Sequence, residues 1–186
     1  MARVDQDLKF LSTDDIKVSL GGIYWYSEIE NNKASTDGSR NAWALFNRIN
    51  YKNLNVVLTG GKQSLSNKDA LTPHSSTFGS FDAEYDIANT GYFYTVDTNY
   101  VFKDVRDSLN ITPYVVFSGF NKKAQGFDDS QRNIVGVVWD YKNISLYTEY
   151  VMSKNDPFVG GTSSSLASGD DGKWNKLLNL MLVYNF

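Results

Sequence analysis

Three regularly spaced carboxylates are the first residues in the sequence that could do chemistry. Asp82, Glu84 and Asp86 alternate with apolar residues inside the long polar segment 63–90. If this segment folds inward, its carboxylates would meet passing solutes and favour cations; if it is a solvated hairpin, they only form an acidic surface. Oxygen ligands of this kind also suit Ca²⁺. The two aspartates within residues 169–172 could do the same, although a plain Gly/Asp turn is the simpler interpretation.

Enzymatic chemistry has little support in the sequence. The single histidine, His74, lies in a Pro/Ser-rich segment without a G-x-S-x-G turn, so a Ser-His-Asp site is not indicated. There is no cysteine, and Gly160 and Gly161 lack the spacing and the Lys-Ser/Thr ending of a phosphate-binding loop. The sequence therefore predicts a protein without catalytic residues, a resident metal or a cofactor.

The composition favours one strand-rich domain. The chain has 186 residues, a net charge of −3, 15% aromatic residues, and 14 Gly against 3 Pro. This charge balance does not indicate nucleic acid as a partner. No apolar run reaches the roughly 18 residues that a transmembrane helix needs. Residues 1–7 show no apolar signal region, which leaves three alternatives: a cytosolic protein, a removed signal, or a piece of a longer chain.

Side-chain alternation with a period of two runs through most of the chain. Because successive side chains of a strand point to opposite faces, this pattern predicts strands with one apolar face. The clearest case is 177–186, where that face carries Leu178, Leu180, Leu182, Tyr184 and Phe186. Eight strands are predicted in all, at residues 16–26, 43–51, 54–61, 92–102, 109–118, 134–141, 144–152 and 177–186. A ninth, weaker strand is predicted within residues 4–11.

The connections between these strands alternate between short turns and long polar loops. The long ones span residues 27–40, 63–90, 121–131 and 154–173. This alternation is typical of transmembrane β-barrels, whose periplasmic turns are short and whose extracellular loops are long. We therefore expect an all-β fold: one antiparallel barrel domain over residues 1–186 with about 8–10 strands. Residues 1–15 would be a periplasmic segment or an extra strand; an extra strand makes the count odd, as in the C-terminal part of a larger barrel.

Aromatic residues gather near both ends of the predicted strands on the apolar face. Those near the short turns include Tyr51, Tyr100, Phe102, Tyr141 and Tyr184. Those towards the long loops are Tyr24, Tyr26, Trp43, Tyr92, Tyr94, Phe117 and Tyr150. Two aromatic girdles around an aliphatic middle match the two interfaces of a bilayer. A soluble barrel or sandwich, in which Tyr and Trp simply fill the strands, is the alternative explanation.

Several segments resemble a known family. The last strand, which ends in Phe186, resembles the assembly signal of bacterial outer-membrane β-barrels. The stretches ANTGYFYTVDTNYV (88–101) and ISLYTEYVMSKNDPFVGG (144–161) look like the C-terminal half of Gram-negative porins, whose chains are usually considerably longer and carry a signal peptide. The resemblance implies an outer-membrane location, contact with the lipid bilayer and lipopolysaccharide, and recognition by the barrel assembly machinery. A homotrimer is a further implied assembly.

Polar residues on the face opposite the apolar one would line the interior of such a barrel. The candidates within strands are Lys17, Arg48, Asp97, Asn99 and Glu149. In a wide barrel their charges would tune ion selectivity. In a narrow eight-stranded barrel they would pair with one another and fill the interior. Arg132 and Asp140 share this face but lie at strand ends, so we interpret them as rim or turn residues.

These observations predict a porin-type channel for the passive diffusion of small hydrophilic solutes or ions, without a chemical step. Asp82, Glu84 and Asp86 form its candidate constriction loop. One alternative is a narrow, non-conducting outer-membrane barrel that acts as a structural anchor or adhesion module through its long loops. Another is a soluble all-β binding protein, which would bury its apolar face without lipid.

Overall fold

The chain folds almost entirely into strands. The computed structural model describes residues 1–31, 36–80 and 83–186. No helix within these ranges is long and apolar enough to cross a membrane. The described residues form one short 3-10 helix, η1 (Lys9–Leu11), and the strands β1 (Ala2–Asp7), β2 (Ile16–Asn31), β3 (Thr36–Tyr51), β4 (Leu54–Ser66), β5 (Ser75–Ser80), β6 (Ala83–Ala88), β7 (Thr90–Tyr100), β8 (Phe102–Arg106), β9 (Leu109–Lys122), β10 (Ser130–Tyr141), β11 (Ile144–Lys154) and β12 (Asn175–Tyr184).

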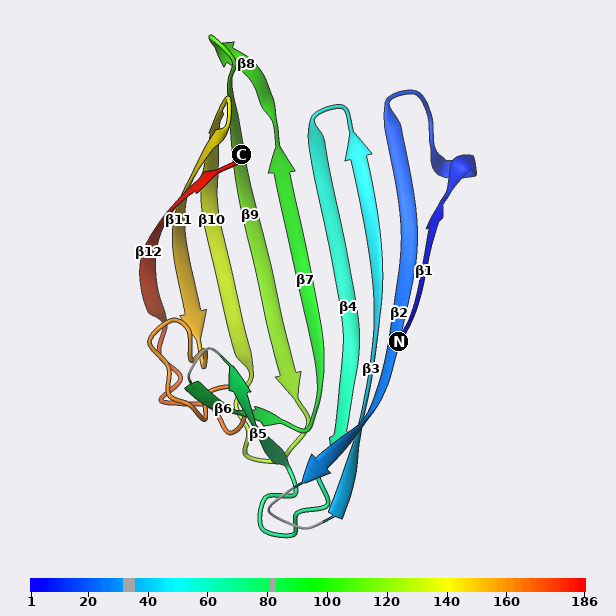
Figure 1. Cartoon of the computed structure of the whole chain (residues 1–186), viewed down its shortest axis with the longest axis vertical. Helices are drawn as coiled ribbons and strands as arrows, with labels where there is room; N and C mark the ends of the chain where they lie inside the picture. The colour runs from blue at the N-terminus through cyan, green and yellow to red at the C-terminus, as the bar shows by residue number, and fades with distance from the viewer. Residues whose placement is uncertain (32–35, 81–82) are drawn as a thin grey trace.

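Ten of these strands form one antiparallel sheet in nearly sequential order. The order is β1-β2-β3-β4-β7-β9-β10-β11-β12, β8 pairs with β9, and β5 and β6 form a separate hairpin. Figure 1 shows the sheet as a twisted wall with the short turns at the top and the longer connections at the bottom. The expected all-β antiparallel fold is confirmed. In the described part of the chain β1 and β12 do not pair with each other, so the sheet has two open edges.

All eight strands expected from the alternation are present, and several are longer than expected. β2 and β3 stay paired from Ile16 opposite Tyr51 to Asn31 opposite Thr36, so most of the expected loop 27–40 is strand. The reason is that backbone pairing continues where both faces are polar, and there the apolar alternation gives no signal. β9 likewise extends to Lys122, which shortens the expected loop 121–131.

Three boundaries differ from the expectations. The ninth strand is β1 at Ala2–Asp7, and residues 9–11 form η1 instead of continuing it. Most of the expected turn 103–108 is strand β8, which leaves a two-residue turn at Asp107 and Ser108 with φ values of 46° and 69°. β12 ends at Tyr184, and the next residue, Asn185, donates its N–H to the Asn143 carbonyl at 2.8 Å.

The sheet has one apolar face, and it is exposed. Side chains that are directly paired across strands lie on the same face, and the register places Leu20, Leu45, Tyr94, Val135 and Leu180 together with their partners on what we call the apolar face. On β12 its residues Leu178, Leu180 and Leu182 are 68%, 65% and 71% exposed. No second layer of the described chain covers this face, and the buried hydrophobic residues are few: Ala44, Leu65, Ala88, Val151, Val159 and Ala167.

The opposite face, here called the polar face, carries aromatic rings that pack over glycines. Phe46 lies over Gly21, Phe93 over Gly61, and Tyr114 over Gly136, each pair being directly opposite in the register. A glycine leaves a strand without a side chain to pack, and a neighbouring ring can fill that gap. These pairs fix the position of the rings on the polar face.

Candidate functional site

A row of polar side chains crosses the polar face at one level. Successive paired positions from β2 to β12 are Lys17, Asn50, Asn55, Asn99, Tyr114, Gly136, Glu149 and Asn179. Three of the five expected interior residues, Lys17, Asn99 and Glu149, belong to this row. Because the row follows the hydrogen-bonded register, it forms a belt perpendicular to the strands.

Both carboxylate oxygens of Glu149 accept hydrogen bonds from other members of this belt. Its Oε1 accepts a short hydrogen bond from the Tyr114 hydroxyl, and its Oε2 accepts one from Asn179 Nδ2 at 2.6 Å. The Tyr114 ring reaches Glu149 across Gly136, where a side chain would block it. Further along the belt, Asn55 Nδ2 donates to Asn99 Oδ1 at 2.8 Å. Glu149 is therefore an anchored carboxylate.

Basic side chains gather on the polar face near β1–β3. Arg48 Nη1 lies 3.5 Å from Asp5 Oδ2, and Arg3 Nη2 lies 3.4 Å from the same oxygen. Both guanidinium groups also lie 5.2 Å from the centroid of the Phe46 ring. Asp5 therefore neutralises part of this cluster, and Lys17 adds a further exposed cation on β2.

Asp97 lies in the middle of the sheet, away from the basic cluster. Its register partners are Val57 on β4 and Val116 on β9. Together with Glu149 on β11, it places the carboxylates on the β7–β11 side of the polar face. The structure thus brings the expected interior residues onto one face and separates them by sign of charge.

The β5–β6 hairpin crosses the loop end of the polar face. On one side its Phe78 ring lies 6.0 Å from Arg40 Cζ, and this guanidinium lies 4.7 Å from the Trp25 ring. Gln63 Nε2 also donates to the Ala88 carbonyl at 3.0 Å. Arg40, Trp25 and Gln63 all point to the polar face, because they have the same parity as Arg48, Lys17 and Gly61 on their strands.

The other side of the hairpin is attached to the segment between β11 and β12. Asp86 N–H donates to the Ser163 carbonyl and Ala88 N–H to the Leu166 carbonyl, both at 2.9 Å. The Tyr85 and Phe158 rings lie 5.0 Å apart. Figure 1 shows the hairpin beside this segment at the bottom of the sheet. The expected hairpin is thus present, and it is fastened over the polar face at both sides.

The three carboxylates of the candidate constriction loop have different surroundings. Asp82 lies outside the described residues, and Glu84 is exposed. Asp86 accepts hydrogen bonds from Thr77 Oγ1 at 2.7 Å and Ser164 Oγ at 3.2 Å. The half-buried Asp86 side chain thus joins the hairpin to the neighbouring segment.

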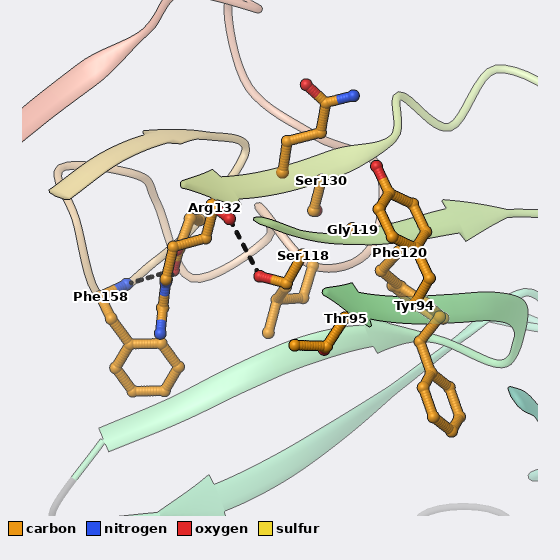
Figure 2. Close-up of a pocket in the computed structure, with 12 residues that line it drawn as sticks. Tyr94, Thr95, Ser118, Gly119, Phe120, Ser130, Arg132 and Phe158 are labelled. Carbon is orange, nitrogen blue, oxygen red and sulfur yellow. Dashed lines mark hydrogen bonds and ion pairs between the residues drawn. The ribbon is translucent and has the colours of Figure 1, made fainter. Parts of the chain in front are cut away.

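A cavity of about 250 Å³ lies between the sheet and the segment that follows β11. Figure 2 shows residues of β7, β9 and β10 together with Phe158 around it. Arg132 Nε and Nη2 donate to Asp156 at 2.5 and 2.7 Å, and the Asp156 side chain is only 5% exposed. Arg132 thus lies near the loop end of β10, where a rim or turn residue was expected, and it is paired there with a buried carboxylate. Its parity was visible in the sequence, but its partner, 24 residues away, was not.

A buried lysine fastens the same segment to β9. Lys122 Nζ donates to the Ser165 carbonyl at 2.6 Å, and Lys122 N–H donates to Asp129 Oδ1 at 2.8 Å. Burial lowers the pKa of Lys122 to about 8, against the opposing effect of the carboxylates of Asp129, Asp128 and Asp170. Lys122 lies at the loop end of β9, beyond the last aromatic residue of its apolar face.

Metal binding has no support in the described part of the chain, where no group of three or more His, Asp or Glu could hold an ion. In the stretch 169–172, Asp170 accepts hydrogen bonds from Ser165 Oγ and from both Thr162 N and Oγ1. Burial raises the pKa of Asp170, but these hydrogen bonds outweigh it and the net pKa is lowered. The Asp170 carboxylate is therefore used in hydrogen bonds within the segment between β11 and β12.

The candidate assembly signal lies at the open β12 edge. Leu178, Leu180, Leu182 and Tyr184 are exposed on the apolar face, and Phe186 follows the strand. No family model, curated protein or solved structure matches the chain.

Proposed function

We propose that the chain is part of an outer-membrane porin-type channel, in which the apolar face meets lipid and the polar face lines a water-filled passage. The observation that carries this proposal is the single-layer sheet itself. One face exposes many large apolar side chains, and the other carries Arg48, Asp97 and Glu149. Monomeric soluble proteins rarely expose apolar patches larger than a few hundred Å².

The ends of the apolar face support a bilayer environment. Tyr24, Tyr92 and Tyr94 lie towards the long connections, and Tyr51 and Tyr141 lie near the short turns. Lysine and aromatic side chains with an apolar body and a polar tip favour membrane interfaces. Lys62 and Lys123 match this: their Nζ atoms lie 5.8 and 4.9 Å from the Tyr92 ring. Their positions fit the phosphate groups of lipopolysaccharide.

A passage needs a closed wall, since an open sheet edge is not tolerated in lipid. Eight antiparallel steps separate β1 from β12, so the two edge strands run in the same direction. An odd number of further strands between them would close an antiparallel barrel. We propose that the wall is completed in this way, as in the C-terminal part of a larger porin.

Charge separation on the polar face would set the selectivity of the passage. The basic cluster is partly neutralised by Asp5, whereas Asp97 and Glu149 add negative charge on the other side. Exposed Glu84 on the hairpin adds to the negative side at the loop end. We expect a moderate preference for cations, because fixed charges that line a passage attract counter-ions.

Single-channel recording in a planar lipid bilayer tests this function. We expect discrete conductance steps, and in a KCl gradient a reversal potential of the sign that indicates cation selectivity. Asp97→Asn should move the reversal potential towards zero. Asp107→Asn is the matched control, because it removes the same charge at an exposed turn. If protein shown to be folded and inserted gives no conductance steps, the proposed channel function of this chain is wrong.

The second candidate is a non-conducting outer-membrane anchor or adhesion module. It is favoured by the attachment of the hairpin to the segment between β11 and β12, which covers the loop end of the polar face. The Tyr114–Glu149–Asn179 bridge also occupies part of that face. The same recordings separate the two candidates, because an anchor inserts without conducting.

A further inference from the structure

The cavity beside β9 and β10 is lined by both aromatic and polar residues. Phe93 and Phe120 stand on the polar face, and their rings pack over Gly61 and Gly91. Phe158 closes the opposite side and is 52% exposed. Since Phe158 contacts Tyr85 at 5.0 Å and lies 5.5 Å from Arg132 Cζ, its ring is held from two directions while part of it stays accessible.

Most of the polar residues that line the cavity are uncharged. Ser118 Oγ donates to the Arg132 carbonyl at 3.0 Å, which leaves the hydroxyl oxygen available as an acceptor (Figure 2). Thr95 adds a second hydroxyl on the neighbouring strand. Of the Arg132 donors, Nε and Nη2 are used by Asp156, so Nη1 is left to face a ligand oxygen.

The charged groups of the cavity favour an uncharged ligand over a charged one of either sign. The Arg132 guanidinium is paired with a buried carboxylate, and Asp156 Oδ1 also accepts the Phe158 N–H at 3.0 Å. An anionic ligand would compete with Asp156 for Arg132, and a cationic ligand would face an already satisfied carboxylate. Breaking such a pair by removing one partner is strongly unfavourable. An uncharged ligand avoids both costs.

The volume of the cavity limits the size of the ligand. The volume of about 250 Å³ lies just below the usual range of small-molecule pockets, which begins near about 300 Å³. We propose that this cavity binds an uncharged, hydroxyl-bearing ring of monosaccharide size, with its apolar face against Phe158 and its hydroxyl groups towards Ser118, Thr95 and Arg132. As a solute site of the passage, this inference rests on the proposed channel function.

Equilibrium binding of methyl β-D-glucopyranoside to the refolded chain tests the proposal. The titration uses calorimetry in micelles of a phosphocholine detergent, because a sugar detergent would compete for the site. Saturable binding is expected. Phe158→Ala should lower the affinity for the glucoside by about fivefold, which is the expected contribution of one aromatic contact. Phe102→Ala is the matched control on the apolar face, 49% exposed in the wild type, and should change binding by less than about twofold.

Three outcomes would overturn the proposal: no saturable binding to folded protein, tighter binding of benzoate than of the glucoside, or equal losses in the two variants. Tryptophan fluorescence confirms the fold of each variant before titration. Micelle binding does not need a closed barrel. A silent bilayer recording with intact glucoside binding would therefore reject the channel alone, and conduction without glucoside binding would reject this site alone.

Discussion

At the scale of single residues, the polar face depends on glycines as much as on charges. Gly136 lies between Tyr114 and Glu149 in the register, and its missing side chain lets the tyrosine ring cross to the carboxylate. A β-carbon at Gly136 would lie 2.5 Å from Tyr114 Cζ. The Tyr114–Glu149 hydrogen bond is therefore a consequence of the glycine.

Gly136→Val is expected to destabilise the folded chain by about 1–3 kcal/mol, because the added atoms collide with a ring that cannot move without leaving Glu149. The free energy of unfolding in urea, followed by tryptophan fluorescence in lipid vesicles, measures this. Gly79→Ala on β5 is the control, since nothing lies within 4 Å of its added β-carbon. A Gly136→Val variant as stable as Gly79→Ala would contradict the role of the ring.

At the scale of elements, the hairpin and the segment after β11 behave as one attached unit over the polar face. The hairpin contributes Tyr85, Asp86 and Ala88, and the segment contributes Phe158, Ser163 and Leu166. Lys122 then ties the segment to β9. These attachments make the loop end a fixed rim above the sheet.

Opening of the segment should depend on pH through Lys122. The pKa of Lys122 is about 8 in the closed segment, against 10.5 for a lysine in the open one. Between these values the open state binds more protons, so the free energy of opening rises with pH, by at most about 1.4 kcal/mol per pH unit. The pKa of Asp170 is lowered by its hydrogen bonds, so this carboxylate adds no slope in the window.

Hydrogen exchange of the backbone amides in 162–169, corrected for the intrinsic rate, measures this opening. Protection should increase from below pH 8 to about pH 10 and then level off. Lys122→Met keeps a side chain of similar length without the titrating group, and its protection should not change with pH. An equal pH response in both proteins would exclude Lys122 as the cause.

β12 offers a matched test of the two faces. Leu180→Arg places a charge on the apolar face in the middle of the strand, and it should cost about 2–4 kcal/mol if that face meets the bilayer centre. Met181→Arg places the same charge one residue further, on the polar face, and should cost much less. Urea titration of both variants in lipid vesicles gives the comparison. Equal destabilisation would contradict a lipid-facing apolar surface.

At the scale of the whole molecule, the apolar face of the sheet has no second layer over it in the described part of the chain. The buried hydrophobic residues there are few and mostly small, while Leu178, Leu182 and many aromatic side chains are exposed. Hydrophobic burial is the main favourable contribution to folding in water. The proposed contact with lipid would supply this burial.

The folded chain should need an amphiphile to stay dispersed. We expect a single species in detergent micelles and aggregation after the detergent is removed. Without detergent, the apolar face, which holds about half of the side chains of each strand, would be exposed to water. Sedimentation velocity with and without detergent measures this. A folded, monodisperse chain in plain buffer would instead favour the soluble all-β binding protein.

The eight main strands and their two faces could be predicted from the alternation of side chains alone. A period of two is a local property, and a residue's face follows from counting along one strand. Lys17, Arg48, Asp97, Asn99 and Glu149 could therefore be assigned to one face without any knowledge of their neighbours. The polar ends of β2 and β3 could not be predicted, because backbone pairing there has no apolar signal.

Only the tertiary structure decided what those side chains meet. Pairing of Arg132 with Asp156, of Asp86 with Ser164 and of Lys122 with Ser165 joins segments 24, 78 and 43 residues apart. Such contacts depend on how loops fold back over the sheet, and no local pattern encodes that path. The sheet's two open edges are likewise a property of the whole strand order, since edge pairing depends on partners far away in the chain.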